Sequence, residues 1–95
     1  MTAEPLSILH VASPGAVGGL ESVLQALAIG QRRAGHRVLV ALVVEPQQEL
    51  DAFVAPFVAA GVDLHMLRVP PRAYLRERRL IRELCIRFRP DVVHT

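Results

Sequence analysis

The sequence predicts an α/β fold, with a partial, Rossmann-like parallel sheet of about four strands in the order 3-2-1-4 and three helices. Short apolar segments rich in β-branched residues alternate along the chain with segments whose apolar residues recur at helical spacing. The 95 residues, 52% of them hydrophobic, suffice for one domain and not for two. Right-handed crossovers between successive strands then place each helix on one face of a twisted parallel sheet.

In the first half of the chain, two apolar segments flank one amphipathic segment. Residues 6–12 form a short apolar segment that ends at a Ser-Pro-Gly turn sequence, which predicts a buried strand. Apolar residues then recur at helical spacing from Leu20 to Ala28, and Gly35 is expected to end this helix. Residues 37–44 are apolar almost throughout, which predicts a second strand covered on both faces.

The second half repeats the alternation. Residues 49–60 have the spacing of a helix, although Pro56 is expected to kink or interrupt it. A third strand is predicted over 62–69, a basic amphipathic helix over 74–89 and a fourth strand over 91–95. Two helices then cover one face of the sheet, one helix covers the other, and the fourth strand keeps a bare edge. This bare edge predicts an incomplete domain.

Cysteine content and hydropathy exclude several classes of protein. Cys85 is the only cysteine, so no internal disulfide forms, and its place on the apolar stripe of the last helix predicts a core position. The longest apolar run, residues 38–44, is too short to span a bilayer, and the N-terminal residues lack the pattern of a secretory signal. We therefore expect a cytoplasmic protein.

The histidines favour structural interpretations. His36 follows Gly35 and is expected to close the preceding helix by bonding its carbonyl groups. His10 and His94 lie on strands that are expected to be neighbours, so they can approach each other near the carboxyl edge of the sheet. A metal pair there is disfavoured, because no local ligand spacing supports it and His65 belongs to another strand. No metal site is expected.

The segment 13–21 contains three glycines between the first strand and the first helix. Gly15, Gly18 and Gly19 let the backbone approach a ligand there, and the helix N-terminus attracts phosphate. The segment matches neither the Gly-Lys-Ser/Thr of a Walker loop nor the Gly-x-Gly-x-x-Gly fingerprint. Two interpretations follow: phosphate binding, or a tight turn in which the helix dipole favours Glu21.

Positive charge is concentrated towards the C-terminus. Residues 68–89 contain eight arginines and two glutamates, a net charge of +6, whereas the remaining residues sum to −4. The simpler interpretation is a solvated helix face, and the functional one is attraction to anionic lipid or an acidic substrate. No nucleic-acid partner is expected, because Tyr74 and Phe88 are the only nearby aromatic residues. The functional interpretation assigns a peripheral contact at the inner membrane face to Arg76, Arg78, Arg79 and Arg82.

Four short segments follow one another in a recognisable order: Gly18-Gly19-Leu20-Glu21, Ala34-Gly35-His36-Arg37-Val38, Ala60-Gly61-Val62 and Arg89-Pro90-Asp91-Val92-Val93-His94-Thr95. Together they resemble the N-terminal, acceptor-side domain of family-four retaining glycosyltransferases, which have the two-domain GT-B architecture. The resemblance covers essentially the whole chain. It implies transfer of a sugar, of hexosyl type, from a nucleotide-sugar to a glycan or lipid-linked acceptor in polysaccharide biosynthesis, without a metal or other cofactor.

The resemblance also implies roles for residues near the first helix. Gly15, Gly18 and Gly19 map onto the loop that meets the donor diphosphate, where amides and a helix N-terminus stabilise the negative charge of the leaving group. Glu21 matches an acidic residue that follows the glycines. A carboxylate repels a diphosphate, so Glu21 is expected to order the loop or to meet the acceptor.

The chain departs from the family at its C-terminal end. His94 matches the first histidine of an Asp-Val-Val-His-x-His motif and is expected to be structural, whereas the second histidine would follow Thr95. No residue is therefore assigned a catalytic role. We expect residues 1–95 to be an incomplete N-terminal domain, without the C-terminal donor-binding domain, and inactive in isolation.

Two other functions compete with this interpretation. One is a small, nonenzymatic Rossmann-like binding or interaction module, which has the same sheet but no catalytic activity and dimerises through the bare edge of its fourth strand. A dinucleotide-dependent oxidoreductase is disfavoured, because the glycine fingerprint is missing and Glu45, the only acid near the end of the second strand, precedes a proline.

Overall fold

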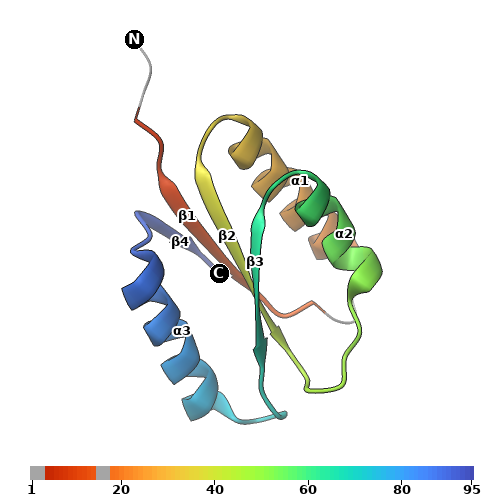
Figure 1. The fold of residues 1–95 in the computed structure, drawn as a ribbon. Coiled ribbons are helices and arrows are strands. Elements are labelled where there is room, and N and C mark those ends of the chain that lie inside the picture. The colour runs from red at the N-terminus through yellow and green to blue at the C-terminus, as the bar shows by residue number, and fades with distance from the viewer. Residues whose placement is uncertain (1–3, 15–17) are drawn as a thin grey trace.

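The computed structural model describes residues 4–14 and 18–95, with side chains for 4–14 and 21–95 (Figure 1). Strands and helices alternate along the chain as predicted. They are β1 (Ser7–Ala12), α1 (Gly18–Arg33), β2 (Arg37–Val44), α2 (Asp51–Ala59), β3 (Asp63–Arg68), α3 (Tyr74–Phe88) and β4 (Val92–His94).

The strands form one parallel sheet in the order β3-β2-β1-β4, which confirms the predicted order. β2 is buried along most of its length, as its continuous apolar sequence predicts for a central strand covered on both faces. β4 is exposed throughout and pairs on one side with β1. In this register His10 lies opposite Val40 of β2 on one side and His94 of β4 on the other.

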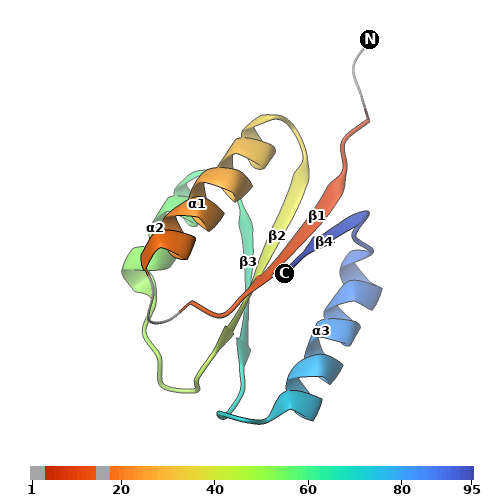
Figure 2. The ribbon, with the colours of Figure 1, turned by 180° about the vertical axis from the view of Figure 1, so that it is seen from behind.

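The helices cover the two faces of the sheet unequally, as Figure 1 and the opposite view in Figure 2 show. α1 and α2 cover one face, where Phe57, Ala28 and Leu42 belong to the first core cluster. α3 covers the other face, where Leu84 and Phe88 pack with strand residues in a second cluster. Cys85, predicted to be a core residue, is partly buried and packs against this second cluster from its margin.

Glycines follow the ends of the first two helices, and Gly35 lies where the end of the first helix is predicted. Gly35 has a φ of 95° and Gly61 a φ of 77°, which are left-handed conformations that residues with a side chain rarely adopt. The interruption expected at Pro56 does not occur, because α2 continues through it to Ala59. Pro56 is exposed, so its ring faces solvent, and one carbonyl in the preceding turn lacks its usual N–H donor.

His36, the residue before β2, makes a different side-chain hydrogen bond from the one predicted. The side chain of His36 does not close α1; its Nδ1 accepts a hydrogen bond from the backbone N–H of Leu6 at 3.0 Å. The carbonyls at the end of α1 are instead satisfied by backbone donors, among them the N–H of His36 to the Gln31 carbonyl at 3.1 Å. The left-handed Gly35 turns this backbone N–H towards the helix, so the imidazole is free to bind the segment before β1.

Candidate functional site

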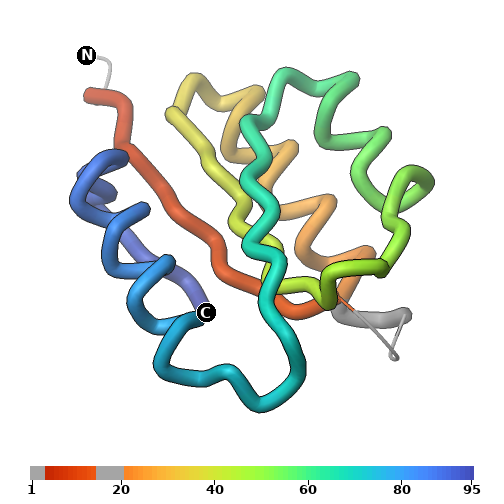
Figure 3. The backbone as a smooth tube through the Cα atoms, turned by 60° about the horizontal axis from the view of Figure 1, so that its bottom comes forward, coloured from red at the N-terminus to blue at the C-terminus, as the bar shows by residue number. Residues whose placement is uncertain are grey.

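The carboxyl edge of the sheet carries the candidate site. The parallel strands β1, β2 and β3 end at this edge, and Figure 3 shows their ends grouped at one end of the molecule. In open parallel sheets, ligands bind outside the carboxyl ends of the strands. An open groove of about 570 Å³ lies there, lined by Ser13, Pro14, Val43, Glu45, Gln48, Val69, Pro70, Pro71, Arg72, Tyr74 and Glu77.

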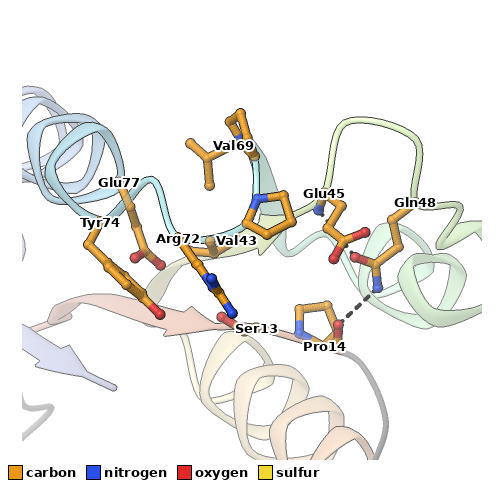
Figure 4. Close-up of a pocket in the computed structure, with 11 residues that line it drawn as sticks. Ser13, Pro14, Val43, Glu45, Gln48, Val69, Arg72, Tyr74 and Glu77 are labelled. Atoms are coloured by element: carbon orange, nitrogen blue, oxygen red, sulfur yellow. Dashed lines mark hydrogen bonds between the residues drawn. The ribbon is translucent and has the colours of Figure 1, made fainter.

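Polar groups of several kinds face this groove. In Figure 4 the Arg72 side chain extends towards Ser13, and the Tyr74 hydroxyl points to the same region. Glu45 and Glu77 supply carboxylates. The groove therefore presents hydroxyl, guanidinium and carboxylate groups beside proline and valine side chains, a mixture that suits a polar ligand with an apolar face.

One wall of the groove is held in place by hydrogen bonds between segments far apart in the sequence. The Arg68 guanidinium donates to the backbone carbonyls of Glu45, Pro46 and Gln48 at 3.1–3.2 Å. The side-chain amide of Gln48 donates to the Pro14 carbonyl at 2.9 Å (dashed in Figure 4). The loop after β2 is thereby fixed between the ends of β1 and β3, so the groove has a defined shape.

A second cavity, of about 670 Å³, lies beside the first helix. Gln48 lines both cavities, which therefore adjoin at this residue. Glu21, a predicted site residue, lines the second cavity with Gln25 and residues at the start of α2, and not the first groove. The side-chain amide of Gln25 donates to the Phe53 carbonyl at 3.0 Å and so ties α1 to α2.

Two of the predicted loop glycines lie at the start of α1. Gly18 and Gly19 are the first two residues of α1, so the positive end of this helix faces the side on which β1 ends. Gly15 lies outside the residues that the structure describes. The described residues thus place two of the three predicted glycines at a helix N-terminus beyond a parallel strand.

The predicted approach of two histidines is confirmed. His10 is 1% exposed, and its Nδ1 lies 3.2 Å from Nδ1 of His94. Its Nε2–H donates to the side-chain oxygen of Gln31 at 2.7 Å, so in the neutral imidazole Nδ1 accepts a hydrogen bond from His94. Burial lowers the pKa of His10; the bond to Gln31 raises it in part, and the charge of His94 lowers it further.

Two classes of feature are absent from the described parts of the chain. Within residues 4–14 and 18–95, no three His, Cys, Asp or Glu side chains are grouped so that they can hold a metal ion. None of the helices in these two ranges is both long enough and apolar enough to cross a membrane.

Several groove residues were missed by the sequence analysis. Gln48, Arg72 and Tyr74 are separated by many residues from Ser13 and belong to no local motif. Each nevertheless follows the carboxyl end of a predicted strand. That position is the one signal in the sequence that points to them.

Comparison with protein families gives a match over most of the chain. The family model described as glycosyl transferase 4-like domain matches residues 18–95, which include every helix and strand from α1 to β4. Comparisons with curated proteins and with solved structures found no match. The order of strands and helices agrees with the family-four resemblance of the sequence. The chain belongs to the glycosyl transferase 4-like domain family.

Proposed function

We propose that this domain is the acceptor-side part of a glycosyltransferase, and that the groove at the carboxyl edge holds the acceptor. The reaction is transfer of a hexosyl group from a nucleotide-sugar to a glycan or lipid-linked acceptor, with retention of configuration. The observation that carries the proposal is the groove itself, where hydroxyl, amide and carboxylate groups converge beside Tyr74. Sugars offer many hydroxyl groups for such partners and an apolar face for an aromatic ring.

The donor diphosphate is assigned in this proposal to the start of α1. Backbone amides at a helix N-terminus have no partner within the helix and point towards an anion. Gly18 and Gly19 occupy that position, and Gly15 belongs to the same loop. Negative charge grows on the diphosphate as it leaves the sugar, so donors fixed in advance at this point lower the barrier.

The remaining parts of the donor belong to a second domain in this proposal, as the resemblance implies. Residues 1–95 then supply the acceptor groove and part of the diphosphate site, and they carry no transfer activity alone. The nucleotide-sugar is a co-substrate, and neither a metal nor another cofactor takes part. The reaction takes place on the cytoplasmic side, as part of polysaccharide biosynthesis.

Saccharide binding tests the acceptor groove. The ¹⁵N-labelled chain is titrated with neutral and acidic oligosaccharides, and amide chemical shifts are followed. Shifts are expected at the segments that line the groove, 13–14, 45–48 and 69–77. Tyr74→Ala is expected to weaken binding, because it removes the aromatic wall, whereas Leu75→Ala serves as the matched control, since Leu75 is 83% exposed and does not line the groove.

Two outcomes of this titration would contradict the proposal: shifts confined to surfaces away from the groove, and equal effects of the two alanine variants. A parallel titration with uridine or guanosine diphosphate tests the donor assignment. It is expected to shift the amides of residues 18–21. Saccharide binding without any nucleoside-diphosphate effect supports a nonenzymatic binding module instead.

We further propose that the outer face of α3 contacts anionic lipid at the inner membrane face. Arg76, Arg78, Arg79 and Arg82 are all exposed. Helical spacing aligns Arg79 and Arg82 with Leu75 and Ile86, which are 83% and 64% exposed, on the side opposite the buried Leu84 and Phe88. Charge attraction together with shallow burial of apolar side chains is the usual basis of peripheral membrane binding.

Co-sedimentation with vesicles tests this contact. The chain is expected to bind vesicles rich in phosphatidylglycerol and to bind vesicles of phosphatidylcholine alone only weakly. Binding to the anionic vesicles is expected to fall with added salt. Arg79→Gln with Arg82→Gln should reduce it several-fold. Arg32→Gln with Arg33→Gln removes the same amount of charge from α1 and should leave most of the vesicle binding intact. Equal binding by both double variants would exclude the proposed surface.

A further inference from the structure

The turn between β3 and α3 holds an arginine in an unfavourable backbone conformation. The Ala73 N–H donates to the Pro70 carbonyl at 3.2 Å and closes a four-residue turn. Pro71 is the second residue of this turn and Arg72 the third, with a φ of 66°. This is the pattern of a type II turn, in which glycine or asparagine is usual at the third position, because a Cβ is strained there.

A different arginine, Arg68, stabilises the loop at this edge of the sheet. Arg68 donates to three backbone carbonyls and fixes the loop after β2. No hydrogen bond joins the Arg72 guanidinium to another described residue, and its side chain extends into the groove towards Ser13 (Figure 4). A strained conformation that the surroundings maintain is a reason to look for a role in function.

The charges in the groove restrict the ligand that Arg72 can serve. Glu45 and Glu77 line the same groove, so its carboxylates outnumber its one guanidinium. A compact polyanion such as a diphosphate is repelled by the two carboxylates. A saccharide with a single anionic group places that group on Arg72 and offers its hydroxyl groups to the glutamates and to Gln48, so every charged group in the groove has a partner.

We propose that Arg72 is the specificity residue of the groove and that it selects an acidic saccharide, one that carries a carboxylate or a phosphate, over a neutral one. The inference rests on the proposed function, in which the groove holds the acceptor. The bond to the anionic group is a charge-assisted hydrogen bond, and the guanidinium fork matches a carboxylate or phosphate with two parallel N–H donors.

The test compares matched acidic and neutral probes on the 95-residue chain. Galacturonic acid, which carries one carboxylate, is compared with its methyl ester, and maltose 1-phosphate with maltose, by the same amide-shift titration. The acidic member of at least one pair is expected to bind about tenfold more tightly. The two pairs distinguish a carboxylate from a phosphate as the recognised group.

Four variants separate recognition from folding. Arg72→Gly and Arg72→Asn are expected to remove the preference for the acidic probe and to keep or raise Tm, because both residues tolerate the left-handed conformation. Arg72→Lys should keep part of the preference, since it retains the charge without the fork. Arg89→Gly is the matched control: Arg89, the other left-handed arginine among the described residues, has a φ of 54° at the end of α3 and does not line the groove.

Each outcome decides the inference. It is overturned if the acidic and neutral members of both pairs bind equally to the unmodified chain, or if Arg72→Gly keeps the preference. It is also overturned if Arg72→Gly weakens uridine diphosphate binding and leaves saccharide binding unchanged. If neither member of any pair shifts the amide resonances of the groove, the assignment of the groove to the acceptor is overturned together with the role of Arg72. If both members shift these resonances equally, only the role of Arg72 is overturned.

Discussion

The Nδ1 atoms of His10 and His94 lie 3.2 Å apart and join the most exposed strand of the sheet to its buried neighbour. At the other end of the same strand pair, the carboxylate of Asp91 accepts the Ser7 N–H at 2.8 Å and the Asp91 N–H donates to the Ser7 carbonyl at 2.7 Å. β4 is thus held to β1 by side chains at both of its ends.

Stability is expected to fall as the pH drops below about 6.5, the ordinary pKa of histidine. Burial lowers the pKa of His10 in the folded chain, so over this range the unfolded chain binds more protons. The free energy of unfolding therefore decreases with falling pH and is fully restored above about 6.5. Urea unfolding between pH 8 and pH 5 measures this change in the free energy of unfolding. His10→Gln should flatten this part of the profile; an unchanged profile would contradict the assignment to His10.

Removal of the Gln31 side chain should destabilise the fold. Gln31→Leu leaves the buried Nε2–H of His10 without its acceptor, which is expected to cost about 1–3 kcal/mol of unfolding free energy. Gln47→Leu is the matched control, because Gln47 is exposed, and it should change stability by no more than about 0.5 kcal/mol. Equal losses in the two variants, measured by urea unfolding, would show that the bond to His10 contributes nothing.

Truncation of the first core should have a larger effect. Phe57 is fully buried and packs edge-to-face against Phe53 with ring centroids 5.4 Å apart. Phe57→Ala is expected to cost about 3–5 kcal/mol, because it removes buried apolar surface and leaves a cavity. Val58→Ala, at a neighbouring position that is 64% exposed, should cost far less. Thermal and urea unfolding compare the two, and similar losses would refute the assigned core.

Loss of Arg68 should loosen the groove wall more than the fold. Arg68→Met removes the donor to three carbonyls in the loop after β2, and we expect faster amide hydrogen exchange over residues 45–50. The cost in unfolding free energy should be only about 1 kcal/mol, since Arg68 is exposed. Arg78→Met, which changes an exposed arginine on α3, should leave exchange in this loop unaltered. Unchanged exchange in Arg68→Met would contradict the role given to this side chain.

The alternation of strands and helices could be predicted from local pattern. β2 has the predicted boundaries, and each other element agrees with its prediction to within a few residues at either end. The sheet order followed as well, because right-handed crossovers leave few arrangements for such a chain. The neighbouring strands then brought His10 and His94 together, as expected. Local prediction was wrong for His36, whose partner is Leu6 rather than the helix that precedes it.

The site depended on contacts that no local pattern encodes. Ser13, Gln48 and Arg72 face one groove only because three parallel strands end at the same edge, and Gln31 meets His10 only because α1 packs on this face of the sheet. Hydropathy spacing decides which face of an element is buried, since burial of apolar surface is non-directional. The partner of each polar group is decided instead by the directional geometry of hydrogen bonds, which exists only once the elements are packed together.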